Sequence, residues 1–346
     1  METKENILEK LPQAVLSWYD QGHRELPWRQ DQDAYHIWLS EIMLQQTRVE
    51  AAKGYYARFL QALPTVQDLA EADDELLHKL WEGLGYYSRV RNLKKAAQVI
   101  VKEYGGVFPG EYEKVLALPG VGAYTAGAIC SIAFGQKTPA VDGNVLRVYC
   151  RLTLDETPVE TPNLKKQVTM ELQRIYPNRT GDFTQALMEL GATVCGPNRR
   201  PDCENCPCRA FCLAHGNDKA NALPVRLPKK ERRVEEKTVF ILSCDGKIAI
   251  RKRPDSGLLA GLWEFPHTPG ILESKEALEV LDKMGIKAEN LEKYVERKHI
   301  FTHIQWNMRA FYITVKKPFR ELTWMPLSQI RSDAALPTAF RQFLQD

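Results

Sequence analysis

The sequence predicts a two-domain protein, in which a large all-α domain is followed by a smaller α+β domain. Apolar residues recur at three- and four-residue spacing from residue 6 to about residue 215, which is the period of amphipathic helices. After Gly216 the pattern changes to alternating, strand-like segments bounded by turns. With 346 residues, the chain is long enough for separate cores in two or three domains.

Composition places the chain among ordinary globular proteins, with 44% hydrophobic and 26% charged residues. A formal charge of +3 is too small to indicate nucleic-acid binding by itself, so any basic surface must be local. The uncharged run 115–136 is long enough to span a bilayer. Pro119, Gly120 and Gly122 break this run near its start, so we reject a membrane span. The charged, amphipathic N-terminus does not have the pattern of a signal peptide.

The domain boundaries follow from this change of pattern. We expect an all-α catalytic region over 1–217 and a charged, proline-containing linker over 218–235. The second domain, 236–346, begins with a hairpin signal, TVFILSC and KIAIRKR joined by Asp-Gly. Its later segments predict a helix at SKEALEVLDKMG, a strand at AFYITV and a last helix at TAFRQFLQ.

A tight turn between two helices interrupts the first domain at LPGVGAYTAGAI, residues 118–129. A glycine turn that opens a helix leaves backbone N–H groups pointing outward, which suits an oxyanion or a bridging cation. On DNA such a turn would hold one phosphate without reading a base. An ordinary helix–helix turn is the alternative.

Asp142 is a candidate catalytic carboxylate in the segment VDGNVLRV. It lies 20 residues after Gly122 in otherwise apolar surroundings, although it could simply cap the next helix. The turn, the following helix and this aspartate together resemble the helix-hairpin-helix DNA glycosylase superfamily, in which the aspartate is essential for breaking the N-glycosidic bond. That cleavage passes through an oxocarbenium-like state, which a fixed carboxylate near C1′ stabilises or traps.

Glu41 is the candidate for the second carboxyl group. It lies in HIWLSEIMLQQT, a strongly apolar helix, where burial would raise its pKa and let it hold a proton near neutral pH. A departing base needs such a proton to become a good leaving group. The alternative is a partly exposed glutamate on the polar side of an amphipathic helix.

The motifs LPWR, SEIMLQQT, GLGYYSR, LPGVGAYTAGA and VDGNV occur in this order. Together they resemble adenine DNA glycosylases of the MutY type, and the resemblance covers nearly the whole chain. It implies excision of adenine opposite 8-oxoguanine or guanine in duplex DNA, with Glu41 protonating adenine N7 and Asp142 supporting the sugar cation. It also implies a six-helix barrel over about 28–136, with the N-terminal helix and 137–217 forming the iron–sulfur part.

The same resemblance assigns further residues to the site. Tyr124 and Asn144 match catalytic-site positions, and Tyr124 stands where bifunctional relatives such as endonuclease III carry a Schiff-base lysine. Without an amine there, base excision should not be followed by strand cutting. Gln46 and Tyr86 would enter the duplex beside the lesion while adenine is flipped out. The implied substrate and DNA contacts are Arg24, Leu26, Trp28, Arg29, Leu44, Gln46, Thr47, Tyr86, Gly120, Gly122 and Gln185.

Five cysteines lie close together in CGPNRRPDCENCPCRAFC, a pattern that indicates metal binding when no secretory signal is present. Four thiolates suit zinc or a [4Fe–4S] cluster, but the pairs are too close together for a zinc ribbon. The resemblance implies a [4Fe–4S] cluster on Cys203, Cys206 and Cys212, which match its C-x2-C-x5-C pattern. Cys195 is the expected fourth ligand; since its spacing to Cys203 is one residue longer than in the family, Cys208 stays an alternative.

The second domain resembles a Nudix-like domain through LLAGLWEFP, residues 258–266. Nudix hydrolysis needs an acidic magnesium-binding helix, and SKEALEVLDKMGI lacks it, so we expect recognition instead of catalysis. The resemblance places Phe301, Thr302 and His303 where the family contacts 8-oxoguanine, with threonine in place of the family serine.

These observations predict a monofunctional adenine DNA glycosylase whose partner is duplex DNA containing adenine opposite 8-oxoguanine. Its expected cofactor is the [4Fe–4S] cluster, and a monovalent or divalent cation could bind at the hairpin turn. We expect a monomer that acts in the bacterial cytoplasm on the nucleoid, without a membrane partner. Three alternatives remain: an endonuclease III-like glycosylase/lyase for oxidised pyrimidines, a non-catalytic DNA-binding protein, and a nucleotide pyrophosphatase, which the missing acidic helix disfavours.

Overall fold

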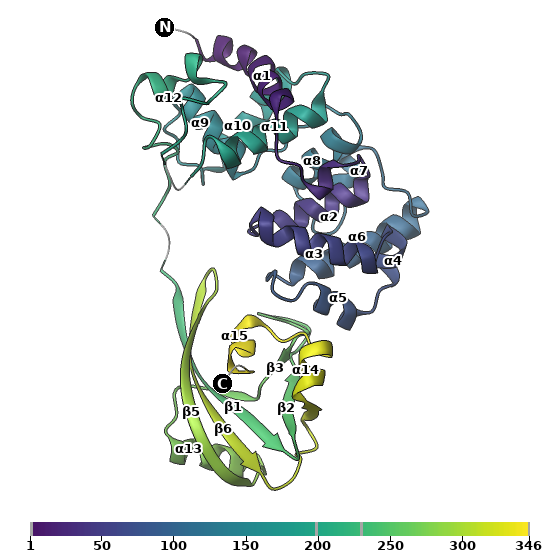
Figure 1. Cartoon of the computed structure of the whole chain (residues 1–346), viewed down its shortest axis with the longest axis vertical. Coiled ribbons are helices and arrows are strands. Elements are labelled where there is room, and N and C mark those ends of the chain that lie inside the picture. The colour runs from purple at the N-terminus through teal and green to yellow at the C-terminus, as the bar shows by residue number, and fades with distance from the viewer. Residues whose placement is uncertain (1–2, 198–199, 229–230, 345–346) are drawn as a thin grey trace. The chain divides into compact units, whose positions relative to one another are not determined.

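The computed structural model describes residues 3–197, 200–228 and 231–344 (Figure 1). The chain forms two compact units, one made of residues 1–71 and 91–228 and the other of residues 72–90 and 229–346. Within the described ranges, no helix combines the length and the apolar character that crossing a membrane requires.

Helices account for the regular structure of the first unit, as the sequence predicts (Figure 1). In chain order they are α1 (Lys4–Gln21), η1 (Pro27–Arg29), α2 (Ala34–Leu44), α3 (Val49–Ala62), α4 (Val66–Glu71), α6 (Ser88–Tyr104, whose first turn belongs to the second unit), α7 (Tyr112–Leu116), α8 (Ala123–Ala133), α9 (Gly143–Thr153), α10 (Pro162–Arg174), α11 (Thr180–Thr193), η2 (Arg209–Phe211) and α12 (Leu213–Gly216).

Two of these helices, α2 and α8, are buried on nearly every side. Their sequences are apolar all round, a composition that is stable only inside a protein core. The two helices pack against each other, so a polar side chain on their shared side must find a partner there. A separate core joins α1, α9, α10 and α11 beside the cysteine loop.

Glycines allow the close contacts that place the start of α9. A Cβ on Gly127 of α8 would lie 2.4 Å from the carbonyl oxygen of Pro139. A Cβ on Gly191 of α11 would lie 2.6 Å from Cβ of Asn144. Both distances are shorter than real Cβ contacts, so only glycine lets α8 and α11 approach the segment that carries Asp142.

The predicted turn between two helices is present between α7 and α8. Gly120 has a φ of +76°, a conformation that favours glycine. Asn92 covers it so closely that an added Cβ would lie 2.5 Å from the Asn92 Cβ. Gly122 is the N-cap residue of α8 and provides no side-chain cap, so the first N–H groups of α8 are available to a ligand.

The second unit is built on a seven-stranded sheet with the order β3-β2-β1-β6-β5, to which β4 adds beside β1 and β7 beside β2. β1 and β6 are parallel, whereas the other paired strands are antiparallel. Its elements are α5 (Asp74–Leu80), β1 (Arg233–Cys244), β2 (Lys247–Lys252), β3 (Trp263–Glu264), β4 (His267–Pro269), α13 (Ser274–Lys283), β5 (Ala288–Ile300), β6 (Ile304–Val315), β7 (Thr323–Pro326), α14 (Leu327–Asp333), α15 (Thr338–Arg341) and η3 (Gln342–Leu344).

The predicted α+β class of this unit is confirmed. Asp245 and Gly246 join β1 to β2 with φ of 48° and 72°, the positive values that a type I′ hairpin turn needs. Strand β1 begins at Arg233, inside the segment expected to be a linker. Lys229 and Lys230 of that predicted linker lie outside the described residues.

Candidate active site

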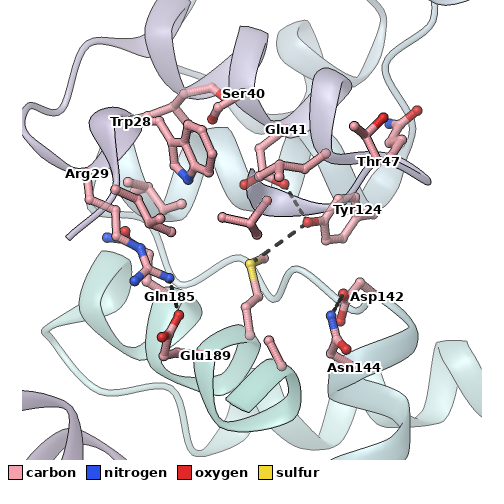
Figure 2. A pocket seen from close by; sticks show the side chains of 18 of the residues that line it. Trp28, Arg29, Ser40, Glu41, Thr47, Tyr124, Asp142, Asn144, Gln185 and Glu189 are labelled. Atoms are coloured by element: carbon pink, nitrogen blue, oxygen red, sulfur yellow. Dashed lines mark hydrogen bonds and ion pairs between the residues drawn. The ribbon is translucent and has the colours of Figure 1, made fainter. Parts of the chain in front are cut away.

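A cavity of about 630 Å³ lies in the first unit, between side chains of η1, α2, α8, α9 and α11 (Figure 2). Most of the residues that the sequence predicts for catalysis and base binding line it. They are Arg24, Leu26, Trp28, Arg29, Glu41, Leu44, Gln46, Thr47, Tyr124, Asp142, Asn144 and Gln185.

Glu41 is buried on α2, with only 6% of its surface exposed. The hydroxyl of Tyr124 donates a hydrogen bond to its Oε2 (Figure 2). Burial raises the pKa of Glu41 from 4.5 to about 7, although the Tyr124 hydrogen bond opposes this shift. The alternative of a glutamate on a polar helix face is therefore wrong, and Glu41 can hold a proton near neutral pH.

Tyr124 is oriented by contacts on both sides of its hydroxyl. Besides Glu41, the hydroxyl contacts the sulfur of Met188 at 3.9 Å. Burial raises the pKa of Tyr124 well above its usual value, and the neighbouring carboxyl groups of Glu41 and Asp142 act in the same direction. The phenol therefore stays protonated and serves as a hydrogen-bond donor to Glu41.

Asp142 is both a helix cap and a cavity residue. Its Oδ1 accepts the backbone N–H of Val145 at 2.7 Å, which caps α9, and its Oδ2 accepts Asn144 Nδ2 at 2.7 Å. Burial raises the pKa of Asp142, while these hydrogen bonds oppose the shift. The capping interpretation is thus confirmed, and it is compatible with the catalytic one because both oxygens are held in fixed positions at the cavity.

Asn144 is itself fixed by Arg147 of α9. The Nη2 of Arg147 donates to Asn144 Oδ1 and to the carbonyl of Gly191, both at 2.7 Å. Its Nε donates to the carbonyl of Cys195 at 2.8 Å. Because the Asn144 oxygen faces Arg147, its amide nitrogen must face Asp142.

Glu189 is a site residue that the sequence analysis missed. Its carboxylate is buried against Arg24 and Arg29, which precede it by 165 and 160 residues. Gln185 and Glu189 are separated by four residues on α11 and therefore lie on one helix face. That spacing was the available signal, but the partners are too distant in sequence for a local pattern to identify them. Lys165 also lines the cavity and was not predicted.

The remaining predicted residues lie elsewhere. Gly120 and Gly122 form the turn before α8, whereas Tyr86, Phe301, Thr302 and His303 belong to the second unit. Within that unit, the hydroxyls of Tyr86 and Thr302 are hydrogen-bonded to each other. Tyr86 has a φ of 45°, and Gln46 in the cavity has a φ of 63°. Such left-handed conformations are costly for residues other than glycine and occur often at functional sites.

The cysteine loop fits the expected cluster. Four thiols, those of Cys195, Cys203, Cys206 and Cys212, line one small cavity. Cys208 instead lies fully buried in the neighbouring apolar core, where it hydrogen-bonds Cys206. Among the described residues, no three His, Cys, Asp or Glu side chains form a site for a metal ion. A four-iron cluster is larger than one ion and keeps its thiolates further apart, so four thiols around one cavity suit it.

Comparison with known proteins shows which protein families the chain resembles. The model of the HhH-GPD superfamily base excision DNA repair proteins matches residues 39–178, and a NUDIX domain model matches residues 238–346. Among solved structures, a thermostable thymine-DNA glycosylase has a TM-score of 0.56 at 29% identity, over 61% of this chain and 97% of its own. An endonuclease III–DNA complex is similar in fold, with a TM-score of 0.53 at 23% identity over 63% of this chain and 99% of its own.

The fold and these matches, together with a cavity in which Glu41 and Asp142 meet, identify the class as base excision DNA glycosylases of the helix-hairpin-helix superfamily. Adenine DNA glycosylase of Rattus norvegicus is 37% identical over 95% of this chain and 77% of its own length. That of Buchnera aphidicola subsp. Schizaphis graminum is 32% identical over 96% and 97%, respectively. The chain belongs to the adenine DNA glycosylase family, which confirms the family, fold class and enzyme class that the sequence predicts.

The raised pKa of Glu41 predicts a pH-dependent stability. From pH 4.5 to about 7 the native state keeps a proton that the unfolded chain has released, so the free energy of unfolding falls as the pH rises. Glu41→Gln removes this loss. We expect the stability of the variant, relative to the unsubstituted protein, to increase by roughly 3 kcal/mol between pH 4.5 and 8.

Denaturant unfolding of both proteins at several pH values measures this difference. Glu103→Gln, which removes an exposed carboxyl on α6, serves as the control and should show no such trend. A difference between Glu41→Gln and the unsubstituted protein that stays constant with pH would contradict the protonated state of Glu41.

Proposed function

We propose that this protein excises adenine from duplex DNA in which adenine stands opposite 8-oxoguanine or guanine, and that it leaves the DNA strand intact. The observation that carries this proposal is that Glu41 and Asp142 line the same cavity. One carboxyl group is able to hold a proton near neutral pH, and the other is fixed by two hydrogen bonds. Because the chain belongs to the adenine DNA glycosylase family, we infer that the excised base is adenine.

The chemistry divides between the two groups according to their surroundings. Glu41 donates its proton to the adenine, so the electron pair of the breaking C1′–N9 bond leaves with a neutral base. Asp142 stabilises the positive charge that develops on the sugar. Water then adds at C1′ and gives up a proton to the Glu41 carboxylate, which restores the acid and leaves free adenine and an abasic site. Tyr124 keeps Glu41 in place through its hydrogen bond.

The second unit suits recognition of the opposite base. The backbone N–H of Phe301 donates to the carbonyl of Ile304 at 2.8 Å, and its ring packs on Trp306 at 4.8 Å. These contacts order the turn between β5 and β6, and Thr302 and His303 are exposed on it. Their hydroxyl and imidazole groups can hydrogen-bond an edge of the damaged guanine.

We further propose that Cys195, Cys203, Cys206 and Cys212 hold a [4Fe–4S] cluster. Burial raises the pKa of Cys195, and Arg151, which donates a hydrogen bond from Nη1 to Cys195 Sγ at 3.1 Å, opposes this shift and favours the thiolate form that a ligand needs. The hydrogen bond with Cys208 lowers the pKa of Cys206, which favours the thiolate form of Cys206 as well. The cluster would tie the end of α11 to α12 and thereby support the segment that carries Asn144 and Arg147.

The catalytic assignment predicts that Asp142→Asn and Glu41→Gln each slow adenine excision by about a hundredfold or more, since acid–base and electrostatic terms have this size. Duplex binding should remain. Single-turnover excision and a binding titration measure the two effects, with Glu103→Gln as the control. Product DNA should break only after alkali is added. Near-normal excision by either variant would remove that residue from the mechanism.

The recognition assignment predicts that the Thr302 hydroxyl contributes to discrimination. Thr302→Val keeps the side-chain shape but removes the hydroxyl, so the preference for adenine opposite 8-oxoguanine over adenine opposite guanine should fall by about tenfold, which corresponds to one hydrogen bond. Thr302→Ser retains the hydroxyl and should behave like the unsubstituted protein. Equal slowing on both duplexes would show that the turn contributes general affinity only.

The cluster assignment predicts about four irons per chain and broad visible absorption in protein purified without chelators. Cys203→Ser should lose iron because it removes a cavity thiol, whereas Cys208→Ser should retain it. Iron and zinc analysis of the three proteins measures this. One zinc and no iron, or loss of iron from Cys208→Ser alone, would contradict the proposed ligand set.

A further inference from the structure

Glu189 is the most completely paired carboxylate of the cavity, yet neither general acid–base chemistry nor sugar stabilisation uses it. Only 2% of its side chain is exposed. Arg24 donates to it from Nε at 2.6 Å and from Nη2 at 2.8 Å. Arg29 donates to it from Nη2 at 2.8 Å (Figure 2). A forked pair with one arginine and a third bond to another hold the carboxylate in a single orientation.

The three residues form one connected unit. The backbone N–H of Arg24 lies 3.4 Å from Glu189 Oε1, and Arg29 Nη1 donates to the carbonyl of Arg24 at 3.1 Å. The chain between α1 and η1 is therefore folded around a carboxylate that α11 provides. Without Glu189, the guanidinium groups of Arg24 and Arg29 would lose the carboxylate that pairs with both of them.

Glu189 is charged in this setting. Burial alone would raise its pKa, but the hydrogen bonds and charges of Arg24 and Arg29 outweigh burial and lower it. A buried ion pair is weak evidence for a contribution to stability, since desolvation offsets much of the attraction. The placement of this unit on the cavity wall indicates a role in the site itself.

Arg29, which pairs with Glu189, also acts on Glu41. The groups that act on it are Tyr124 from α8, Asp142 at the start of α9, and Arg29 from η1, whose positive charge favours the ionised form of Glu41. Helix α3 contributes only the uncharged Val49 to the cavity, and α10 contributes the exposed Lys165. Glu189 therefore compensates the charge of Arg29, the arginine that acts on Glu41.

We propose that Glu189 is a positioning residue of the adenine site, which holds Arg24 and Arg29 in the cavity wall and offsets their charge beside Glu41. This inference rests on the proposed function only through the role of Glu41 as the acid. The uncompensated charge of Arg29 would otherwise favour ionised Glu41, and an ionised Glu41 has no proton to donate.

Glu189→Gln tests the proposal because it keeps the size and an acceptor oxygen but removes the charge. Excision by a protonated Glu41 is present below its pKa and is lost above it. In the variant this alkaline loss should begin at lower pH, so single-turnover excision should fall about tenfold at pH 8 for each pH unit by which the Glu41 titration moves. The loss at pH 5.5 should be several-fold smaller.

Further variants separate charge from shape. Glu189→Asp keeps the charge and should keep the alkaline limb of the pH profile, even if the rate falls because the arginines are less well held. Adding Arg29→Gln to Glu189→Gln removes the uncompensated charge and should return the limb toward that of the unsubstituted protein. A uniform loss of rate at every pH in Glu189→Gln, with the limb unmoved, would mean that Glu189 is structural only.

A direct titration makes the test independent of catalysis. The Glu41 carboxyl can be followed by infrared difference spectroscopy in DNA-free protein, with Glu41→Gln as the blank. A lower Glu41 titration midpoint in Glu189→Gln supports the proposal even if the protein acts on a different base. An unchanged midpoint overturns it, whatever the excision assay shows.

Discussion

The arrangement of the site depends on one constraint, which is that three carboxyl groups from distant parts of the chain share a single cavity wall. Like charges in a low-dielectric interior repel, and an isolated buried carboxylate is costly. Each group meets this constraint differently. Glu41, among apolar side chains, can keep its proton; Asp142 is held by the amide donors at the start of α9; and Glu189 is paired with two arginines. The environments divide the roles among chemically similar groups.

The backbone around the cavity fixes the position of the segment that carries Asp142. Gly127 and Gly191 allow α8 and α11 to approach the start of α9 more closely than any Cβ would permit. Arg147 then spans the gap by binding Asn144 and the carbonyl of Cys195. Asp142, the proposed catalytic residue, is thus supported from the side of the cysteine loop, so the proposed metal cluster would have a structural role there.

Local sequence was sufficient for much of the site. Glu41, Tyr124 and Asp142 lie in short motifs whose helical period and glycine turns define their backbone, and the cavity brings these residues together as expected. The role of Glu189 could not be predicted in this way, because it depends on contacts with Arg24 and Arg29. These arginines come close to Glu189 only when α1 packs against α11. The burial of Glu41 could not be predicted for the same reason. The helical period allowed Glu41 to be either exposed or buried, and only the packing of α2 against α8 shows that it is buried.

The second unit shows that a recognisable motif need not mark the functional surface. In LLAGLWEFP, Trp263 and Glu264 form β3, which pairs with β2. Glu264 is buried, and although burial opposes its ionisation, His267 and its arginine partners lower its pKa to about 2. It accepts Arg251 Nε at 2.8 Å and also pairs with Arg253, so it joins neighbouring strands internally. The motif therefore defines the fold, whereas the surface that we propose for recognising a base is the exposed turn between β5 and β6, which lies outside this motif.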